Sequence, residues 1–309
     1  MNRLDKIFLF LVLLLFAQLA YPQPAAVVEK DRLEAGDKFL AQGEVEKAIA
    51  EYDVVIKFNP RNAQAFGMRG YARMLNRDTD GAIADYTTAI KLTPNAPGIE
   101  KAYNNRGTAY QYRGDHINAF NDFDRAISIN PKYASPYNGR AVIWKSRGKI
   151  DEALADFTKA VEINPALTPA YAGRGDIRFQ RGEFDLAFAD YNKAVELDPL
   201  GASIRLWRGV LQGARNRWEY AVDDLKTAFS LQKMADPALG GSMTPAFLDL
   251  DKYLAANPKK ARVLAARGFI NLLRRKDADA EPDFKRAFAL EPALKKILEE
   301  FVSHVKETR

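Results

Sequence analysis

A spacing of 34 residues organises most of this 309-residue chain. Small residues recur along it in one register, and a second small residue follows each of them 12 positions later. An aromatic residue or a leucine comes four positions after that. One such unit is too short to bury its own apolar face, so consecutive units must stack on one another. The first column of small residues consists of Gly36, Gly70, Gly107, Ala141, Gly175, Gly209 and Gly268.

These columns predict a helical hairpin in each unit. A glycine inside a helix costs about 1 kcal/mol relative to alanine, so glycine in nearly every unit needs a steric reason. Close approach of two helices is such a reason, because the glycine of the first helix can face the small residue of the second. A proline then ends each second helix, since it disfavours a helical predecessor and has no N–H. The prolines are Pro60, Pro94, Pro131, Pro165, Pro199, Pro258 and Pro292.

The pattern resembles the tetratricopeptide repeat, a helix-turn-helix unit of 34 residues. The resemblance covers about residues 29–292 and is clearest in the third unit. It implies an all-α fold in which antiparallel helix pairs stack into a right-handed superhelical solenoid. The third unit fills the positions of the motif with Tyr103, Gly107, Tyr110, Ala119, Phe123, Ala126 and Pro131.

The same register divides the chain into segments. After six repeats we expect an irregular insert at 236–260 with one extra helix, a seventh repeat at 261–292 and a capping helix at 293–309. We interpret the insert, which is rich in glycine and proline, as a spliced repeat that has lost its first helix. The alternative is a loop that overhangs the groove. The six repeats span 29–62, 63–96, 100–133, 134–167, 168–201 and 202–235.

Residues 1–25 have the layout of an export signal. Arg3 and Lys6 precede an apolar run from Ile7 to Ala20. As a helix this run would rise about 21 Å, which is short of the roughly 30 Å of a bilayer core. We therefore expect a cleaved signal peptide and a periplasmic or secreted protein. The alternative is an uncleaved anchor in the inner membrane that faces the periplasm, and only this segment would then contact a membrane.

The composition argues against most catalytic chemistry. The chain has no cysteine and two histidines, which removes disulfides, thiolate metal sites, cysteine nucleophiles and histidine-rich metal sites. The sequence also has no phosphate-binding glycine loop and no zinc-protease helix. We therefore expect no enzymatic activity, no cofactor and no metal.

The net charge of +6 could suggest an anionic partner. The excess lies in residues 257–309, which carry 13 basic and 8 acidic side chains, and stacking aromatics do not alternate with the basic residues as they would in a nucleic-acid reader. We therefore expect no nucleic-acid partner.

In six units an arginine also precedes the small residue and an aspartate precedes the aromatic column. Two interpretations are open: ion pairs between these arginines and aspartates within the fold, or a row of charged side chains that binds a ligand. The repetition in so many units favours the ion pairs within the fold.

The resemblance implies a concave groove, lined by the first helix of each repeat, that takes a peptide from a protein partner. In this register Asn104 and Asn138 are expected to hydrogen-bond the partner backbone, and Tyr71 and Phe179 to offer apolar contacts. The expected groove residues are Tyr71, Met74, Asn104, Thr108, Gln111, Asn138, Val142, Lys145, Asp176 and Phe179.

The fold and the missing catalytic motifs together predict a non-enzymatic protein–protein interaction module or scaffold of the cell envelope. Its partner would be a protein or peptide, and self-association is possible through the apolar ends of the stack. Two alternatives remain open at this point: a substrate-holding subunit of an envelope enzyme complex, and a self-associating structural assembly factor.

Overall fold

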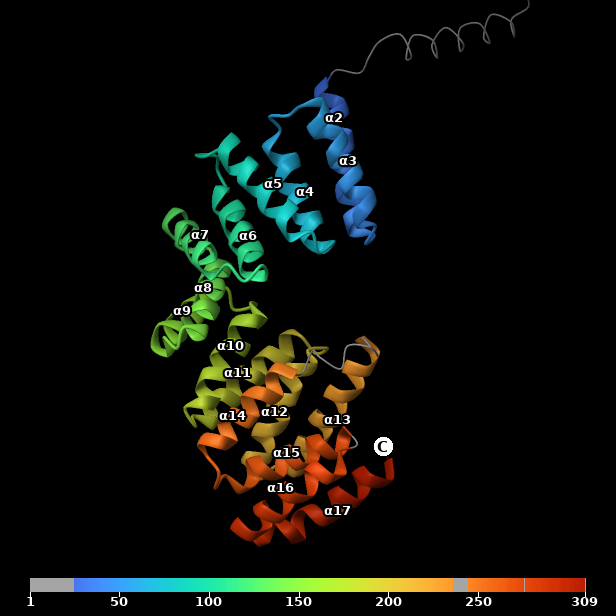
Figure 1. Ribbon diagram of the computed structural model, residues 1–309, viewed down its shortest axis with the longest axis vertical. Coiled ribbons are helices and arrows are strands. Elements are labelled where there is room, and N and C mark those ends of the chain that lie inside the picture. The colour runs from blue at the N-terminus through green and yellow to red at the C-terminus, as the bar shows by residue number, and fades with distance from the viewer. Residues whose placement is uncertain (1–24, 236–243, 275, 309) are drawn as a thin grey trace, which may run out of the picture. The chain divides into compact units, whose positions relative to one another are not determined.

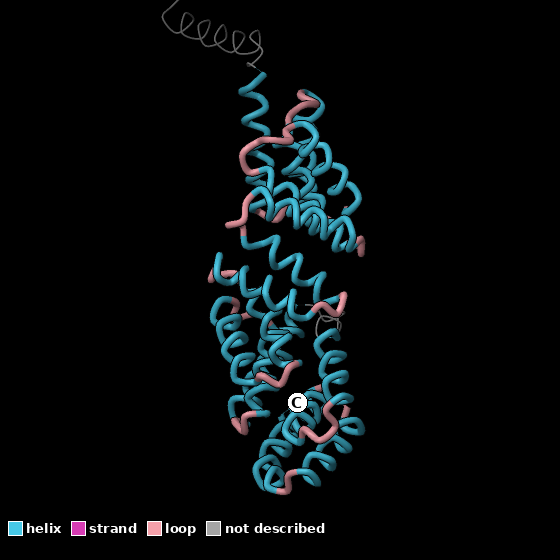
Figure 2. The backbone as a smooth tube through the Cα atoms, turned by 90° about the vertical axis from the view of Figure 1, so that its left-hand side faces the viewer, coloured by secondary structure: helices cyan, strands magenta, loops and turns pink. Residues whose placement is uncertain are grey.

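The computed structural model describes residues 25–235, 244–274 and 276–308 (Figure 1). Helices form all the regular structure of these residues, which include no strand (Figure 2). The predicted all-α class is therefore confirmed. The export-signal prediction falls on residues 1–25, of which 1–24 lie outside the described part. Among the described helices, none combines the length and the apolar character needed to cross a membrane.

The chain divides into two compact units, residues 1–140 and residues 141–309, which we call the N-terminal unit and the C-terminal unit. The division falls inside α8, Ala134–Ser146, the first helix of the fourth predicted repeat. In the N-terminal unit the helices pair as α2 with α3, α4 with α5 and α6 with α7, and each pair packs on the next. Their bounds are Ala25–Ala41, Val45–Phe58, Ala63–Leu75, Thr79–Leu92, Ile99–Tyr112 and His116–Ile129.

Aspartates at the helix starts explain why two of the second helices begin where they do. The Asp78 carboxylate accepts the backbone N–H of Gly81 at 2.9 Å, and Asp115 accepts that of Asn118 at 3.1 Å. Each side chain satisfies one of the N–H groups that the first turn of a helix leaves free. The turns before α5 and α7 are fixed in this way.

The glycine column marks the closest approach of the two helices in a repeat. A Cβ atom placed on Gly107 would lie 2.9 Å from Phe123 Cε1 and 3.3 Å from the Ala119 carbonyl oxygen. Both Phe123 and Ala119 are buried. A side chain at position 107 therefore has no room, which is the contact that the sequence predicts.

The C-terminal unit continues the same architecture and adds two helices outside the regular pairs. Its last helix, α17, buries Leu294 and Leu298 and lies where the capping helix is predicted. The helix α14 lies within the predicted insert. The helices of this unit after α8 are α9 Ile150–Ile163, α10 Thr168–Gln180, α11 Phe184–Leu197, α12 Ala202–Ala214, α13 Trp218–Ala235, α14 Thr244–Ala256, α15 Ala261–Leu273, α16 Asp277–Leu290 and α17 Ala293–Thr308.

The arginine and aspartate columns pair with each other inside the repeats. Arg106 donates from Nε and Nη2 to the two carboxylate oxygens of Asp122, at 2.7 and 2.8 Å. Planar two-point pairs of this kind are stronger than single hydrogen bonds, and Asp122 is buried. The pairing within the fold that the sequence favours is therefore confirmed over a ladder for ligands. The same pairs form at Arg69–Asp85, Arg174–Asp190, Arg208–Asp224 and Arg267–Asp283.

Candidate partner-binding surface

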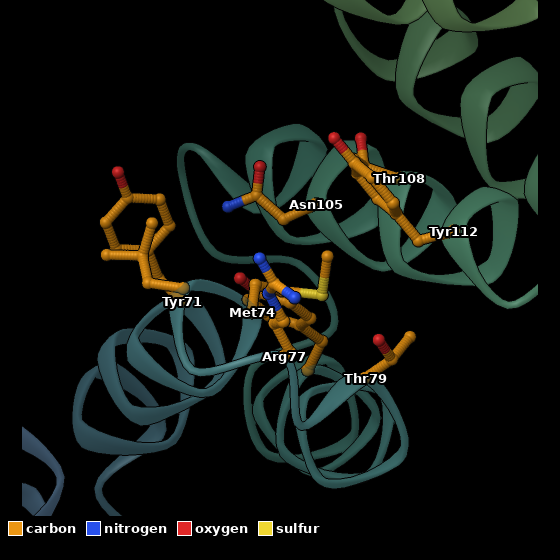
Figure 3. Close-up of a pocket in the computed structure, with 9 residues that line it drawn as sticks. Tyr71, Met74, Arg77, Thr79, Asn105, Thr108 and Tyr112 are labelled. Carbon is orange, nitrogen blue, oxygen red and sulfur yellow. The ribbon is translucent and has the colours of Figure 1, made fainter. Parts of the chain in front are cut away.

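A pocket of about 630 Å³ lies in the N-terminal unit between α4, α5 and α6. We call it the α4–α6 pocket. Figure 3 shows Tyr71 on one side of it and Tyr112 on the other, with Met74 and Arg77 between them. The lining residues are Tyr71, Met74, Leu75, Arg77, Thr79, Tyr86, Asn105, Thr108 and Tyr112.

Large apolar side chains at the rim of the pocket remain open to solvent. Tyr112 is 77% exposed, Tyr71 is 50% exposed and Leu75 is 49% exposed. Single exposed apolar residues are ordinary, but several around one concavity mark a surface that contacts another molecule. A partner that covered these side chains would remove apolar area from water, which is favourable.

Polar groups of the pocket are held in place by bonds within the unit. Tyr86 is buried, and Asn105 Oδ1 accepts a hydrogen bond from Asn104 Nδ2 at 3.2 Å. Burial raises the pKa of Tyr86 above its ordinary value, so the phenol stays neutral. Thr108 donates from Oγ1 to the Asn104 carbonyl oxygen at 3.0 Å. The polar groups that α5 and α6 contribute to the lining are therefore amides and hydroxyls, and the formal charge in the lining is that of Arg77.

The structure separates the predicted groove residues of the N-terminal unit into two groups. Tyr71, Met74 and Thr108 line the α4–α6 pocket, whereas Gln111 is half-buried outside its lining. Asn104 does not offer its amide to a partner as predicted, because it is 8% exposed and its Nδ2 donates to Asn105 Oδ1 at 3.2 Å. The neighbouring Asn105 faces the pocket instead.

Asn138 is the last predicted groove residue of the N-terminal unit. Its Oδ1 atom is shielded from solvent and has no hydrogen-bond partner among the described residues. Its predicted bond to a partner backbone stays a prediction.

In the C-terminal unit the predicted charges bind each other. Lys145 Nζ donates to Asp176 Oδ2 at 2.7 Å, and the Tyr191 hydroxyl donates to the other oxygen of the same carboxylate. Val142 is exposed on α8. The Lys145–Asp176 ion pair thus links α8 to α10, and each charge is neutralised within the unit rather than by a ligand.

The prediction for Phe179 is wrong, because this side chain is only 2% exposed. Its ring centroid lies 4.8 Å from that of Trp207 on α12 and 4.6 Å from that of Tyr253 on α14. The extra helix therefore covers the surface of α10 that the repeat register assigns to the groove. The columns of the regular repeats do not predict this contact, since Tyr253 lies in the insert.

The position of α14 supports the interpretation of the insert as a spliced repeat. Arg69 Nη1 lies 2.5 Å from Asp53 Oδ1, on the second helix of the preceding repeat. Arg267 Nη1 lies 2.7 Å from Asp251 Oδ1, at the same separation of 16 residues. Helix α14 thus takes the place of a second helix next to α15, while its Tyr253 also reaches back to α10.

Models of one repeat family match the chain in four places. They are described as "Tetratricopeptide repeat" over residues 33–97, 100–133 and 134–167, and as "TPR repeat" over residues 175–214. Together these matches cover more than half of the chain. The stacked helix pairs and these matches show that the chain belongs to the tetratricopeptide repeat family.

Two human proteins are similar over part of this chain. Tetratricopeptide repeat protein 6 from Homo sapiens is 29% identical over 119 residues, which make up 38% of this chain and 22% of that protein. Tetratricopeptide repeat protein 28 from Homo sapiens is 32% identical over 108 residues, 35% of this chain and 4% of that protein. The matched part thus spans less than a quarter of either relative.

Solved structures share the fold at low sequence identity. A tetratricopeptide repeat protein from Parabacteroides merdae covers 91% of this chain with 98% of its own, at a TM-score of 0.54 and 18% identity. The Pseudomonas aeruginosa pilF structure matches over 76% of this chain and 100% of its own length, with a TM-score of 0.59 and 15% identity. A chain of the APC/C hetero-tetramer Cut9-Hcn1 matches over 74% of this chain and 46% of its own length, with a TM-score of 0.61 and 15% identity. These likenesses show the fold alone.

Proposed function

We propose that this chain is a non-enzymatic protein–protein interaction module and that it binds a partner segment in the α4–α6 pocket. The observation that carries the proposal is the ring of exposed apolar side chains around this pocket, Tyr71, Leu75 and Tyr112. Tetratricopeptide repeats generally act as interaction modules rather than as enzymes, which is in keeping with a surface of this kind.

The size and chemistry of the pocket suit part of a peptide. Its volume of about 630 Å³ lies in the range of roughly 300–1,000 Å³ that is usual for sites of small ligands. One or two large side chains of a partner would fill it, with Tyr71 and Tyr112 as walls. The Asn105 amide and the Thr108 hydroxyl would orient the segment through polar contacts, as fixed polar groups do in apolar sites.

Site-specific photo-crosslinking tests the location of the site. A photoreactive amino acid at Leu75, in the pocket, should capture a partner segment when the full-length chain is expressed in its native cell. The same amino acid at Leu186, an exposed leucine on α11, serves as the matched control. The crosslink at position 75 should disappear in a Tyr71→Ala/Tyr112→Ala variant and persist in Tyr220→Ala, which removes an exposed tyrosine of α13. Equal capture at both positions would reject the pocket as the site.

We further propose that the protein acts outside the cytoplasm, as a scaffold of the cell envelope. Support comes from the layout of residues 1–25, where two basic residues precede an apolar run of 14 residues. Cell fractionation with N-terminal sequencing of the mature protein separates the alternatives. Cleavage near Ala20 supports a signal peptide, an intact N-terminus in the membrane fraction supports an anchor, and a cytoplasmic protein contradicts both.

A further inference from the structure

Arg77 lies in a backbone conformation that L-amino acids with side chains rarely adopt. Its φ is +62°, in the left-handed region, within the turn between α4 and α5. Four other repeats place a glycine at this turn position, and glycine adopts such angles without a steric penalty. In the sixth repeat the residue is Asn216, a type that tolerates the region better than arginine. The glycines are Gly43, Gly114, Gly148 and Gly182, with φ between 73° and 82°.

The sequence has arginine at this position in the second and the seventh repeat, Arg77 and Arg275, and Arg77 lies at the α4–α6 pocket. Arg77 is one of the nine lining residues, and no aspartate, glutamate or lysine is among the others. A strained residue at a candidate site is a reason to examine a functional role. Here the strained position supplies the one formal charge of the pocket lining.

The carboxylates near Arg77 are bound to other groups. Asp78 caps α5 and lies 3.5 Å from Arg73 Nε, and Asp80 lies 3.1 Å from Arg113 Nη1. In the part of the chain that the structure describes, no acidic side chain pairs with the Arg77 guanidinium. The pocket therefore presents a cation beside apolar walls without an internal counter-charge.

We propose that Arg77 selects an acidic partner segment by pairing with its carboxylate while an apolar side chain enters between Tyr71 and Tyr112. This inference rests on the proposed function of the α4–α6 pocket. Charge complementarity argues for it, because a cation beside aromatic walls is matched by an anion and repels lysine or arginine. A guanidinium can also bind a carboxylate through two parallel hydrogen bonds, which sets the orientation of the segment.

Short fluorescent peptides with an amidated C-terminus test the proposal on the full-length chain. Each contains one phenylalanine flanked by glutamates, by glutamines or by lysines, and binding is followed by fluorescence anisotropy. We expect the glutamate peptide to bind about tenfold more tightly than the glutamine peptide, since one charge-assisted contact has about that effect. The lysine peptide should bind most weakly. A glutamine peptide with a free C-terminus shows whether a terminal carboxylate can replace the side chain.

The variant Arg77→Gly separates binding from folding because its two effects have opposite signs. Removing the side chain should abolish the preference for glutamate over glutamine, while the melting temperature rises or stays the same as the backbone strain is relieved. The matched control Asn216→Gly makes the same type of change in the C-terminal unit and should leave the preference intact. Arg77→Lys should keep part of the preference, because it retains the charge without the two-point geometry.

The outcomes distinguish this proposal from the one on which it rests. If Arg77→Gly keeps the glutamate preference, or if the wild-type chain has none, the role of Arg77 is overturned. The pocket itself stands in that case if Tyr112→Ala still weakens the glutamine peptide. If no peptide responds to Tyr112→Ala, both proposals fail.

Discussion

The α4–α6 pocket has a counterpart at the same register of the C-terminal unit, between α10, α11 and α12. The pocket of the N-terminal unit has a volume of about 630 Å³, whereas the counterpart leaves no room for a water molecule. In the repeat register Phe179 corresponds to Met74 and Trp207 to Asn105. The counterpart is lined by Asp176, Phe179, Gln180, Tyr191 and Trp207.

The difference arises from side chains, because the helical frame is the same in both places. A glycine of the first helix faces a tyrosine of the second in each, Gly70 with Tyr86 and Gly175 with Tyr191. In the C-terminal unit two larger aromatic rings and Tyr253 of α14 fill the space in front of this frame. The same repeat architecture thus leaves an open pocket in one unit and a filled core in the other, according to the residues at two register positions and the presence of an additional helix.

The largest effect is expected from Trp207→Ala. Truncating a buried aromatic residue to alanine costs about 3–5 kcal/mol, and Trp207 is buried against Phe179. The register equivalent Asn105→Ala should cost about 1 kcal/mol, through loss of the hydrogen bond that Asn105 Oδ1 accepts from Asn104 Nδ2. Urea unfolding followed by circular dichroism measures both. Similar losses for the two variants would contradict the assignment of one position to core and the other to a binding surface.

Much of this frame could be predicted from the sequence, because it depends on contacts that recur. The Gly107–Phe123 approach and the Arg106–Asp122 pair each repeat in several units, so their columns are visible without a structure. The burial of Phe179 could not be predicted in this way. It depends on Trp207 and on Tyr253, and Tyr253 belongs to the insert, where the regular repeats are interrupted.

The candidate site could be predicted in part. Tyr71, Met74 and Thr108 follow from the face of the first helices, whereas on α6 the predicted Asn104 is buried and its neighbour Asn105 lines the pocket. A rotation of about 100° per residue separates neighbouring side chains on a helix, so a shift of one position here replaces a buried group by a half-buried one. The signal for Arg77 was present in the sequence as a break in the glycine column of the turns, yet only the backbone angle shows that the break is strained.

The next effect tests whether the two units share the same hairpin packing. Gly107→Leu and Gly175→Leu should each cost about 1–3 kcal/mol, because the added side chain meets an aromatic ring. The Cβ atom would lie 2.9 Å from Phe123 Cε1 in the first case and 3.2 Å from Tyr191 Cε1 in the second.

Gly67→Ala is the control for these substitutions. An added Cβ at Gly67 meets no atom within 4 Å, so alanine should stabilise α4 by about 0.5–1 kcal/mol through its higher helix propensity. Thermal and urea unfolding of the three variants measure the effects. A Gly175→Leu protein as stable as wild type would show that the C-terminal unit tolerates a wider helix separation than the N-terminal unit.

The smallest effect concerns the place of α14 in the stack. If α14 replaces a second helix, the ion pair between Asp251 and Arg267 is equivalent to the ion pair between Asp53 and Arg69. Both carboxylates are about half exposed and accept a hydrogen bond from the arginine Nη1. Exposed ion pairs contribute about 0.2–1 kcal/mol, so Asp251→Ala and Asp53→Ala should lower the free energy of unfolding by similar small amounts. Both losses should shrink at high salt, because salt screens exposed charges. A loss only for Asp53→Ala would mean that α14 is held by Tyr253 and its apolar neighbours alone, and the spliced-repeat interpretation would then lose its support from this ion pair.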